Sequence, residues 1–185
     1  FFTVLHSNIT NAYESRPFNI LDDEAYSFGV KNYIRYKKNT FELKLGQDYI
    51  KERYNWKIKE TLSGEEGPIL NEYSEDRDVF SIFGDISYSH NDQISILTGL
   101  SYNFRKYVLT DLFNDSVDNS GSFKYRPITA TFFGINFNLY NNFRMYASYS
   151  YGFSYPSVEE TLLPSGLKNE NLKPETGNNF ELGLR

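Results

Sequence analysis

The segment that decides the fold is NFRMYASYSYGFSYPSVEETLLPSGLKNENLKPETGNNFELGLR, residues 142–185. From Phe143 to Phe153 the odd positions carry apolar or aromatic side chains, and the even positions carry mostly small or polar ones. This alternation has a period of two and predicts a β-strand. It stops at Pro156, because proline cannot donate a hydrogen bond to a neighbouring strand, and resumes only from Phe180 onward. The segment therefore predicts two strands joined by a long polar loop.

The same segment carries an ordered set of short motifs. The set comprises Tyr-Ala-Ser-Tyr at 146–149, Gly152, Phe153, Pro156, Glu159, Asn171, Leu172, Pro174, Glu175, Glu181 and Gly183. In this order the motifs resemble the middle of the β-barrel of TonB-dependent outer-membrane receptors. In that family an upward strand is followed by Gly-Phe-x-x-Pro, an acidic residue, a variable insert, Asn-x-x-Leu-x-Pro-Glu-Thr and a downward strand with Glu-x-Gly. The sequence departs by one extra Asn-Glu pair, so Asn169 and Asn171 are both candidates for the family's asparagine.

Alternation with the same period recurs along the rest of the chain. We predict eight strands, at residues 1–10, 26–36, 41–50, 78–88, 94–107, 125–140, 143–153 and 179–185. In the first strand both faces contain apolar residues, so its facing stays open. All but the last are near or above the roughly 9–11 residues that a tilted strand needs to cross a bilayer.

Short and long connections alternate between these strands. Tight turns are predicted at 37–40, 91–92 and 141–142, and long polar loops at 10–25, 51–76, 109–123 and 154–178. Bacterial transmembrane barrels show this asymmetry, with short periplasmic turns and long extracellular loops. The sequence therefore predicts an all-β fold, namely an antiparallel segment of a transmembrane β-barrel.

The composition excludes several other classes of protein. The chain has 16 Tyr and 16 Phe but a mean hydropathy of −0.55, as expected of strands with one apolar face. No run of 18 apolar residues is present, which excludes a transmembrane helix. The net charge of −5 argues against nucleic acid as a partner. The absence of cysteine excludes disulfides and thiolate metal sites.

The number of strands leaves two architectures open. Eight strands could close into a small barrel filled by its own side chains, but many predicted inward residues are Gly or Ser and would underfill it. The resemblance instead implies a larger, plugged barrel of about 22 strands. On that interpretation residues 1–185 are a partial barrel domain, and the plug and the remaining strands are not in this chain. We expect such a piece to be unstable alone, because each end strand would expose an unpaired edge.

Function is implied by the resemblance rather than by a catalytic motif. No nucleophile elbow, phosphate loop or paired-histidine motif is present, so no catalytic residue, cofactor site or metal site is predicted. The resemblance implies a receptor in the bacterial outer membrane that imports a scarce ligand, most often an iron complex such as a ferric siderophore. The implied partners are the TonB-ExbB-ExbD complex, acting through the plug, and membrane lipid with lipopolysaccharide. The alternative is a self-contained eight-stranded barrel that acts as an enzyme or an adhesion protein.

Aromatic residues in the predicted long loops are the candidates for ligand contact. They are Tyr54, Trp56, Tyr73, Phe113 and Tyr155. Such side chains suit flat or apolar ligand surfaces, although each could instead pack a loop or contact lipopolysaccharide. The predicted loops are also acidic, which favours a neutral or cationic ligand.

The alternation also predicts which side chains face lipid. These are Phe80, Ile82, Ile94, Ile96, Leu100, Phe133, Ile135, Phe137, Met145 and Tyr149. Tyr36, Tyr88 and Tyr140 lie near the short turns and are expected to form the periplasmic aromatic girdle.

Overall fold

Nine β-strands form one antiparallel sheet in the computed structural model, which describes residues 1–62, 65–91, 93–113, 118–140, 143–156 and 172–184. The strands are β1 (Phe2–Ser15), β2 (Asn19–Lys38), β3 (Phe41–Leu62), β4 (Glu65–His90), β5 (Ile94–Asp111), β6 (Gly121–Lys124), β7 (Ile128–Tyr140), β8 (Phe143–Ser154) and β9 (Glu175–Leu184). The predicted all-β antiparallel fold is confirmed. Within these ranges no helix is long and apolar enough to cross a membrane.

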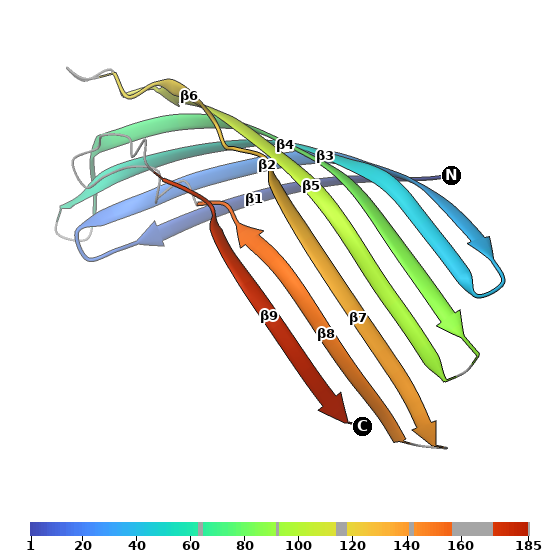
Figure 1. The fold of residues 1–185 in the computed structure, drawn as a ribbon. Coiled ribbons are helices and arrows are strands. Elements are labelled where there is room, and N and C mark those ends of the chain that lie inside the picture. The colour runs from blue at the N-terminus through green and yellow to red at the C-terminus, as the bar shows by residue number, and fades with distance from the viewer. Residues whose placement is uncertain (63–64, 92, 114–117, 141–142, 157–171, 185) are drawn as a thin grey trace.

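The strands lie in chain order across the sheet. The order is β1-β2-β3-β4-β5-β7-β8-β9. β6 also pairs with β5, past the residues of β5 that pair with the start of β7. The sheet twists, so that β1 to β4 run at a steep angle to β7 to β9 (Figure 1). β1 does not pair with β9 in the part of the chain that the structure describes. The sheet is therefore open, which does not support the self-contained eight-stranded barrel.

Two of the predicted long loops are wrong. Residues 10–25 belong mostly to β1 and β2, which are joined at Arg16–Phe18, and residues 51–76 belong mostly to β3 and β4. These stretches extend the hairpins with ladders of paired residues, such as Lys57 opposite Glu72. Opposite charges on neighbouring strands stabilise such pairs, so a charge-rich stretch remains a strand. Pro68 is accommodated near two register shifts, between Ile58 and Thr61 on β3.

The other boundaries differ from the prediction more modestly. The strand predicted at 125–140 begins only at Ile128, directly after Pro127, which lacks a backbone donor. β6 lies almost wholly within the loop predicted at 109–123, and this additional strand gives nine strands instead of eight. β5 continues to Asp111, and β9 begins at Glu175 instead of residue 179. Of the loop predicted at 154–178, residues 157–171 lie outside the described part of the chain.

The strand register assigns side chains to two faces, which we call outer and inner. Directly opposed residues on neighbouring strands share a face. Ile96 on β5 is opposed by Tyr88 on β4 and by Ile135 on β7, so these three side chains lie on the same face. By the same register all ten residues predicted to face lipid lie on one face, the outer face. Tyr36 and Tyr88 also lie on it near the short turns, whereas the side chain of Tyr140 is outside the described set. Contact with lipid itself stays a prediction.

The sheet has two ends, which we call the turn end and the loop end. At the turn end, β2 to β3, β4 to β5 and β7 to β8 are joined by the short connections at 39–40, 91–93 and 141–142. Asn39 and Asn91 have positive φ angles of 51° and 52°, which asparagine tolerates in tight turns. At the opposite loop end, the inner face carries a hydrophobic core of Leu21, Trp56, Tyr73 and Leu109.

Candidate ligand-binding site

The candidate site lies on the inner face at the loop end of the sheet. Trp56 on β3 and Tyr73 on β4 are directly opposed, and their rings stack with centroids 4.6 Å apart. Both are buried, with 7% and 2% exposure, and they pack with Leu21 and Leu109. Asn119 donates a hydrogen bond to the Tyr73 hydroxyl at 3.3 Å. Burial raises the pKa of that hydroxyl, which therefore stays protonated at neutral pH. This stack forms the rigid base of the site.

A buried charged group lies beside the stack. Glu75 is only 2% exposed and accepts a hydrogen bond from Nε of Arg77 at 2.5 Å. The Arg77 guanidinium also lies 5.6 Å from the ring centroid of Tyr54 and 3.8 Å from a carboxylate oxygen of Glu52. Burial raises the pKa of the Glu75 carboxyl, and the positive charge of Arg77 opposes that rise. Oε2 of Glu75 has no hydrogen-bond partner among the described residues.

A second aromatic group continues the site toward β8. Tyr107 and Phe123, opposed on β5 and β6, stack with centroids 4.4 Å apart, and Tyr125 packs 5.8 Å from Tyr107. Tyr155, which follows β8, lies 5.2 Å from Tyr125. The Arg105 guanidinium lies over the Tyr155 ring at 5.1 Å, a cation–π geometry. Its Nε is buried, and within the described residues it has no acceptor.

The hydroxyl of Tyr155 fixes this ring against the sheet. It donates to the backbone carbonyl of Asn103 at 3.4 Å, and the ring meets Phe153 edge to face at 5.0 Å. Asn103 is itself buried and accepts a hydrogen bond from Ser81 at 2.7 Å. The start of the connection after β8 is therefore held against β5.

The structure distributes the five predicted ligand-contact residues over two groups. Tyr54, Trp56 and Tyr73 lie together on β3 and β4, on strands instead of loops. Tyr155 lies in the neighbouring group with Arg105. Phe113 follows β5, and its N–H donates to Asp111 at 3.1 Å. Whether any of the five contacts a ligand stays a prediction.

Sequence reasoning missed several residues of the site. Arg77, Tyr107 and Tyr125 were not singled out, although all three contact its charged or aromatic members. A signal was available, since Arg77 and Tyr107 occupy inward positions of the period-two pattern. Their pairing depends on the β4–β5 register.

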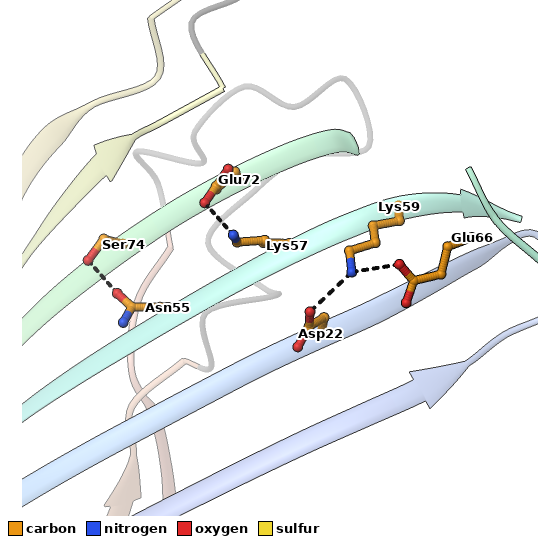
Figure 2. A network of polar contacts seen from close by, with 7 residues as sticks. All are labelled: Asp22, Asn55, Lys57, Lys59, Glu66, Glu72 and Ser74. Atoms are coloured by element: carbon orange, nitrogen blue, oxygen red, sulfur yellow. Dashed lines mark hydrogen bonds and ion pairs between the residues drawn. The ribbon is translucent and has the colours of Figure 1, made fainter. Parts of the chain in front are cut away.

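Three acidic residues of the β3–β4 extension, Glu66, Glu72 and Asp76, lie on the outer face, away from the site. Lys57 pairs with Glu72 at 3.0 Å, and Lys59 pairs with Asp22 at 3.3 Å and Glu66 at 3.1 Å (Figure 2). These carboxylates are neutralised by neighbouring lysines. Glu52 and Glu75 lie on the inner face at the site, so the preference for a neutral or cationic ligand stays a prediction.

Comparison with known proteins identifies the family. The family model described as TonB dependent receptor-like, beta-barrel matches residues 2–185, nearly the whole chain. The chain belongs to this family of TonB-dependent receptor barrels. No curated protein sequence matches it.

Solved TonB-dependent receptors have the same fold over this region. The ferric citrate transporter FecA in the unliganded form is 13% identical, with a TM-score of 0.75 over 99% of this chain and 28% of its own. The copper transporter OprC is 13% identical, with a TM-score of 0.72 over 98% of this chain and 32% of its own. The ferric yersiniabactin uptake receptor FyuA from Yersinia pestis is 13% identical, with a TM-score of 0.65 over 99% of this chain and 30% of its own. The chain thus spans about a third or less of the length of these receptors.

Several residues of the predicted family motif lie on β8 and β9. Gly152 and Gly177 are directly opposed, and a Cβ atom on either would meet nothing within 4 Å. Glu181, on the inner face, accepts a hydrogen bond from Asn179 at 2.9 Å. The ring of Tyr146 lies over Gly183, where a Cβ atom would overlap it.

The remaining motif residues flank the long connection between these strands. Phe153 and Glu175 stand at its two ends, in β8 and β9, and Pro156 is buried just after β8. Leu172 and Pro174 are half-buried just before β9. Glu159, Asn169 and Asn171 lie outside the described residues.

Proposed function

We propose that this chain is the ligand-binding side of an outer-membrane receptor that imports an iron complex with energy from the TonB-ExbB-ExbD complex. The observation that carries the proposal is the inner-face site, in which Arg105 and Glu75 each keep one buried polar atom that no described residue pairs with. Such atoms are costly unless something pairs with them. A ligand in the lumen of the barrel would supply that partner.

The chemistry of the site suits an oxygen-rich iron complex. The Nε–H of Arg105 is a donor for a carboxylate or phenolate oxygen, and charge-assisted hydrogen bonds of this kind are strong. The ring of Tyr155 beside Arg105 and the ring of Tyr54 beside Arg77 offer flat apolar surface. Several related receptors carry iron complexes, including the transporter of ferric citrate and the receptor of ferric yersiniabactin. The copper transporter OprC makes copper the second candidate cargo.

Residues 1–185 are then part of a larger barrel of about 22 strands. The exposed edges of β1 and β9 would then pair with further strands, and the plug would fill the lumen. Relatives that are transporters favour transport over catalysis for the complete receptor.

The proposal also places the chain across the bacterial outer membrane. On β5 the outer face is mostly apolar from Ile94 to Phe104, about 34 Å along the strand at 3.4 Å per residue. A tilt of about 45° reduces this to about 24 Å, close to the roughly 25 Å apolar band of such barrels. We expect lipid to cover this band, and lipopolysaccharide to surround the strand extensions at the loop end.

Ligand binding to the purified complete receptor tests the proposal. Ferric citrate, a ferric catecholate and haem would each be titrated against wild type and the variants Arg105→Gln and Tyr155→Ala. We expect at least one complex to bind, and each variant to weaken that binding about tenfold or more. Tyr36→Ala, on the outer face at the turn end, is the matched control. Equal binding by all four proteins would refute the assigned site.

A further inference from the structure

Carboxylates outnumber cations on the inner face at the candidate site. Four rows of directly opposed residues run from the row of Arg105 to the row of Trp56. On β2 to β5 the carboxylates of these rows are Asp23, Glu52, Glu75 and Asp111. The cations are Arg77 and Arg105. Four carboxylates against two guanidinium groups leave two negative charges in excess, which favours a cationic group beside this face.

Arg77 compensates two of these carboxylates unequally. Its Nε donates to Glu75 at 2.5 Å, whereas its closest approach to a carboxylate oxygen of Glu52 is 3.8 Å. Glu75 is only 2% exposed, but the side chain of Glu52 is 35% exposed. Because the attraction between charges weakens with distance, the charge of Glu52 is the less compensated of the two. Glu52 is therefore the carboxylate that a ligand on the inner face can reach.

The buried carboxylate of Glu75 adds a second acceptor near Glu52. The two residues are diagonal neighbours on β4 and β3, about 7–8 Å apart. Oε2 of Glu75 has no hydrogen-bond partner within the described residues. A buried acceptor of this kind calls for a donor. A cation held by Glu52 would lie in the negative potential of both groups.

The ring of Tyr54 stands between Glu52 and a further carboxylate. Tyr54 is the next inner-face residue of β3 after Glu52, and its hydroxyl donates to Asp23 at 2.8 Å. Aromatic faces attract cations, and the Arg77 guanidinium already lies 5.6 Å from the centroid of this ring. Carboxylates beside an aromatic face suit an alkylammonium group, which has both N–H donors and an apolar stem.

Small side chains on β2 keep this position open. Ser27 directly opposes Glu52, and Ala25 directly opposes Tyr54. Neither side chain is long enough to extend over its neighbour on β3. We call the group of Glu52, Tyr54 and Asp23 the ammonium subsite.

The ammonium subsite and Arg105 lie far enough apart to hold two ends of one ligand. Glu52 and Arg105 are one row and two strands apart. At about 3.4 Å per residue and about 4.8 Å between strands, their backbones are separated by about 12 Å. Arg105 offers its Nε–H to an oxygen atom at one end, and Glu52 accepts from a cation at the other.

We infer that the receptor takes an iron complex with two unlike ends, one presenting chelating oxygen atoms and the other a free alkylammonium group. The ammonium group binds Glu52, with Tyr54 and Asp23 beside it. Glu75 is a positioning residue, because it holds Arg77 and so keeps Glu52 available. A complex that carries several negative charges and no cation is disfavoured by the same carboxylates. The inference rests on the proposed function for the transport of iron complexes, and it adds the charge of the cargo.

Binding of two ferric trihydroxamates to the complete receptor tests the inference. Both contain the same linear chelator, which ends in a free alkylammonium group in one and is N-acetylated in the other. The iron centre is identical, so only the terminal charge differs. Calorimetric titration gives the two dissociation constants. We expect wild type to bind the ammonium form about 30-fold more tightly, as one charge-assisted hydrogen bond allows.

Variants identify the residues that set this ratio. Glu52→Gln/Asp23→Asn is expected to bind the two forms within about threefold of each other. Glu75→Gln frees Arg77 to pair with Glu52 and is expected to lower the ratio to about fivefold. Loss of packing alone would weaken both forms equally and leave the ratio unchanged. The ratio compares two ligands on one protein, so it does not depend on the folded fraction.

Two control variants separate the ammonium subsite from the rest of the site. Arg105→Gln is expected to weaken both forms alike and to keep the ratio. Glu24→Gln removes a carboxylate one residue from Asp23, but on the outer face, and is also expected to keep the ratio.

The outcomes distinguish this inference from the proposed function. If wild type binds both forms equally, or if Glu52→Gln/Asp23→Asn keeps the preference, the ammonium subsite is wrong. If wild type binds neither form, the inference is overturned as well, but binding of ferric citrate would then leave the proposed function standing. Failure to bind any iron complex would overturn both.

Discussion

The ring of Phe83 lies over Gly46, its directly opposed partner on the inner face of β3 and β4. A Cβ atom at residue 46 would lie 2.6 Å from Cζ of Phe83 and 2.5 Å from the backbone carbonyl oxygen of Asn32. Three further inner-face glycines are each covered by a ring of an opposed residue: Gly29 by His6, Gly99 by Phe132 and Gly183 by Tyr146. Aromatic coverage of this kind compensates for the side chain that glycine lacks in a strand.

Replacing Gly46 with alanine is expected to destabilise the barrel by about 1–3 kcal/mol, because the carbonyl of Asn32 cannot rotate away as a side chain could. Urea unfolding of the complete receptor in detergent measures the change. Gly152→Ala is the matched control on the same face, where a new Cβ meets nothing. It is expected to be neutral or slightly stabilising, since alanine costs less backbone entropy than glycine. Equal losses for both variants would contradict the role of ring coverage.

Arginine at Ile96 is expected to cost about 2–4 kcal/mol, because this outer-face position lies in the apolar band. Arginine at the adjacent Ser95, on the inner face opposite Asn136, is expected to be tolerated. Folding yield into lipid vesicles and urea unfolding give the two values. If both substitutions cost the same, the assignment of the faces is wrong.

The Trp56 indole is predicted to contribute through its area and not through its N–H. Its Nε1 is buried without a partner among the described residues, so Trp56→Phe removes no hydrogen bond. We expect Trp56→Phe to change stability by less than about 1.5 kcal/mol, and Trp56→Ala to cost about 3–5 kcal/mol. A large loss for the phenylalanine variant would reveal a partner for the N–H.

The two carboxyls near the loop end predict opposite pH dependences. Burial raises the pKa of Glu75 above 4.5, so its unfavourable charge is lost as pH falls toward 4.5. Hydrogen bonds from Tyr13 and Lys59 lower the pKa of Glu66, so its favourable contribution is present above pH 4.5 and is lost as pH falls further. Melting temperatures of wild type, Glu75→Gln and Glu66→Gln between about pH 7 and pH 2.5 measure the two contributions, each as the difference between wild type and one variant. As pH falls, the melting temperature of wild type minus that of Glu75→Gln should increase. The melting temperature of wild type minus that of Glu66→Gln should decrease. If both differences change in the same direction, the assigned environments are wrong.

Sequence alone predicted the strands of the apolar band better than their extensions. Within the band one face is uniformly apolar, so the alternation that contains Ile96 and Ile135 identifies both strand and facing. Beyond the band the polarity reverses, because Trp56 and Tyr73 point inward while charged residues such as Lys57 point outward. The alternation of apolar and polar residues is therefore interrupted at residues 51–76, and the sequence predicts a loop where the structure has paired strands.

The candidate site lies beyond the apolar band, so the sequence predicted only some of its residues. Aromatic character singled out Trp56 and Tyr73, but their stacking depends on the β3–β4 register. That register is shifted at Ile58 and Lys59 and has no turn signal as clear as those of the short turns. The association of Arg105 with Tyr155 joins positions 50 residues apart and follows from the sheet order, which no local pattern contains.

Growth of a strain that lacks the complete receptor, on single iron sources, tests the central claim most directly. The account predicts that growth fails on at least one iron complex, returns with the wild-type gene, and fails again when the TonB-ExbB-ExbD complex is removed. If the deletion impairs growth on no iron complex but abolishes growth on an oligosaccharide or a vitamin, the iron assignment is contradicted while transport stands. If the deletion impairs uptake of no nutrient, the proposed function as a whole is contradicted.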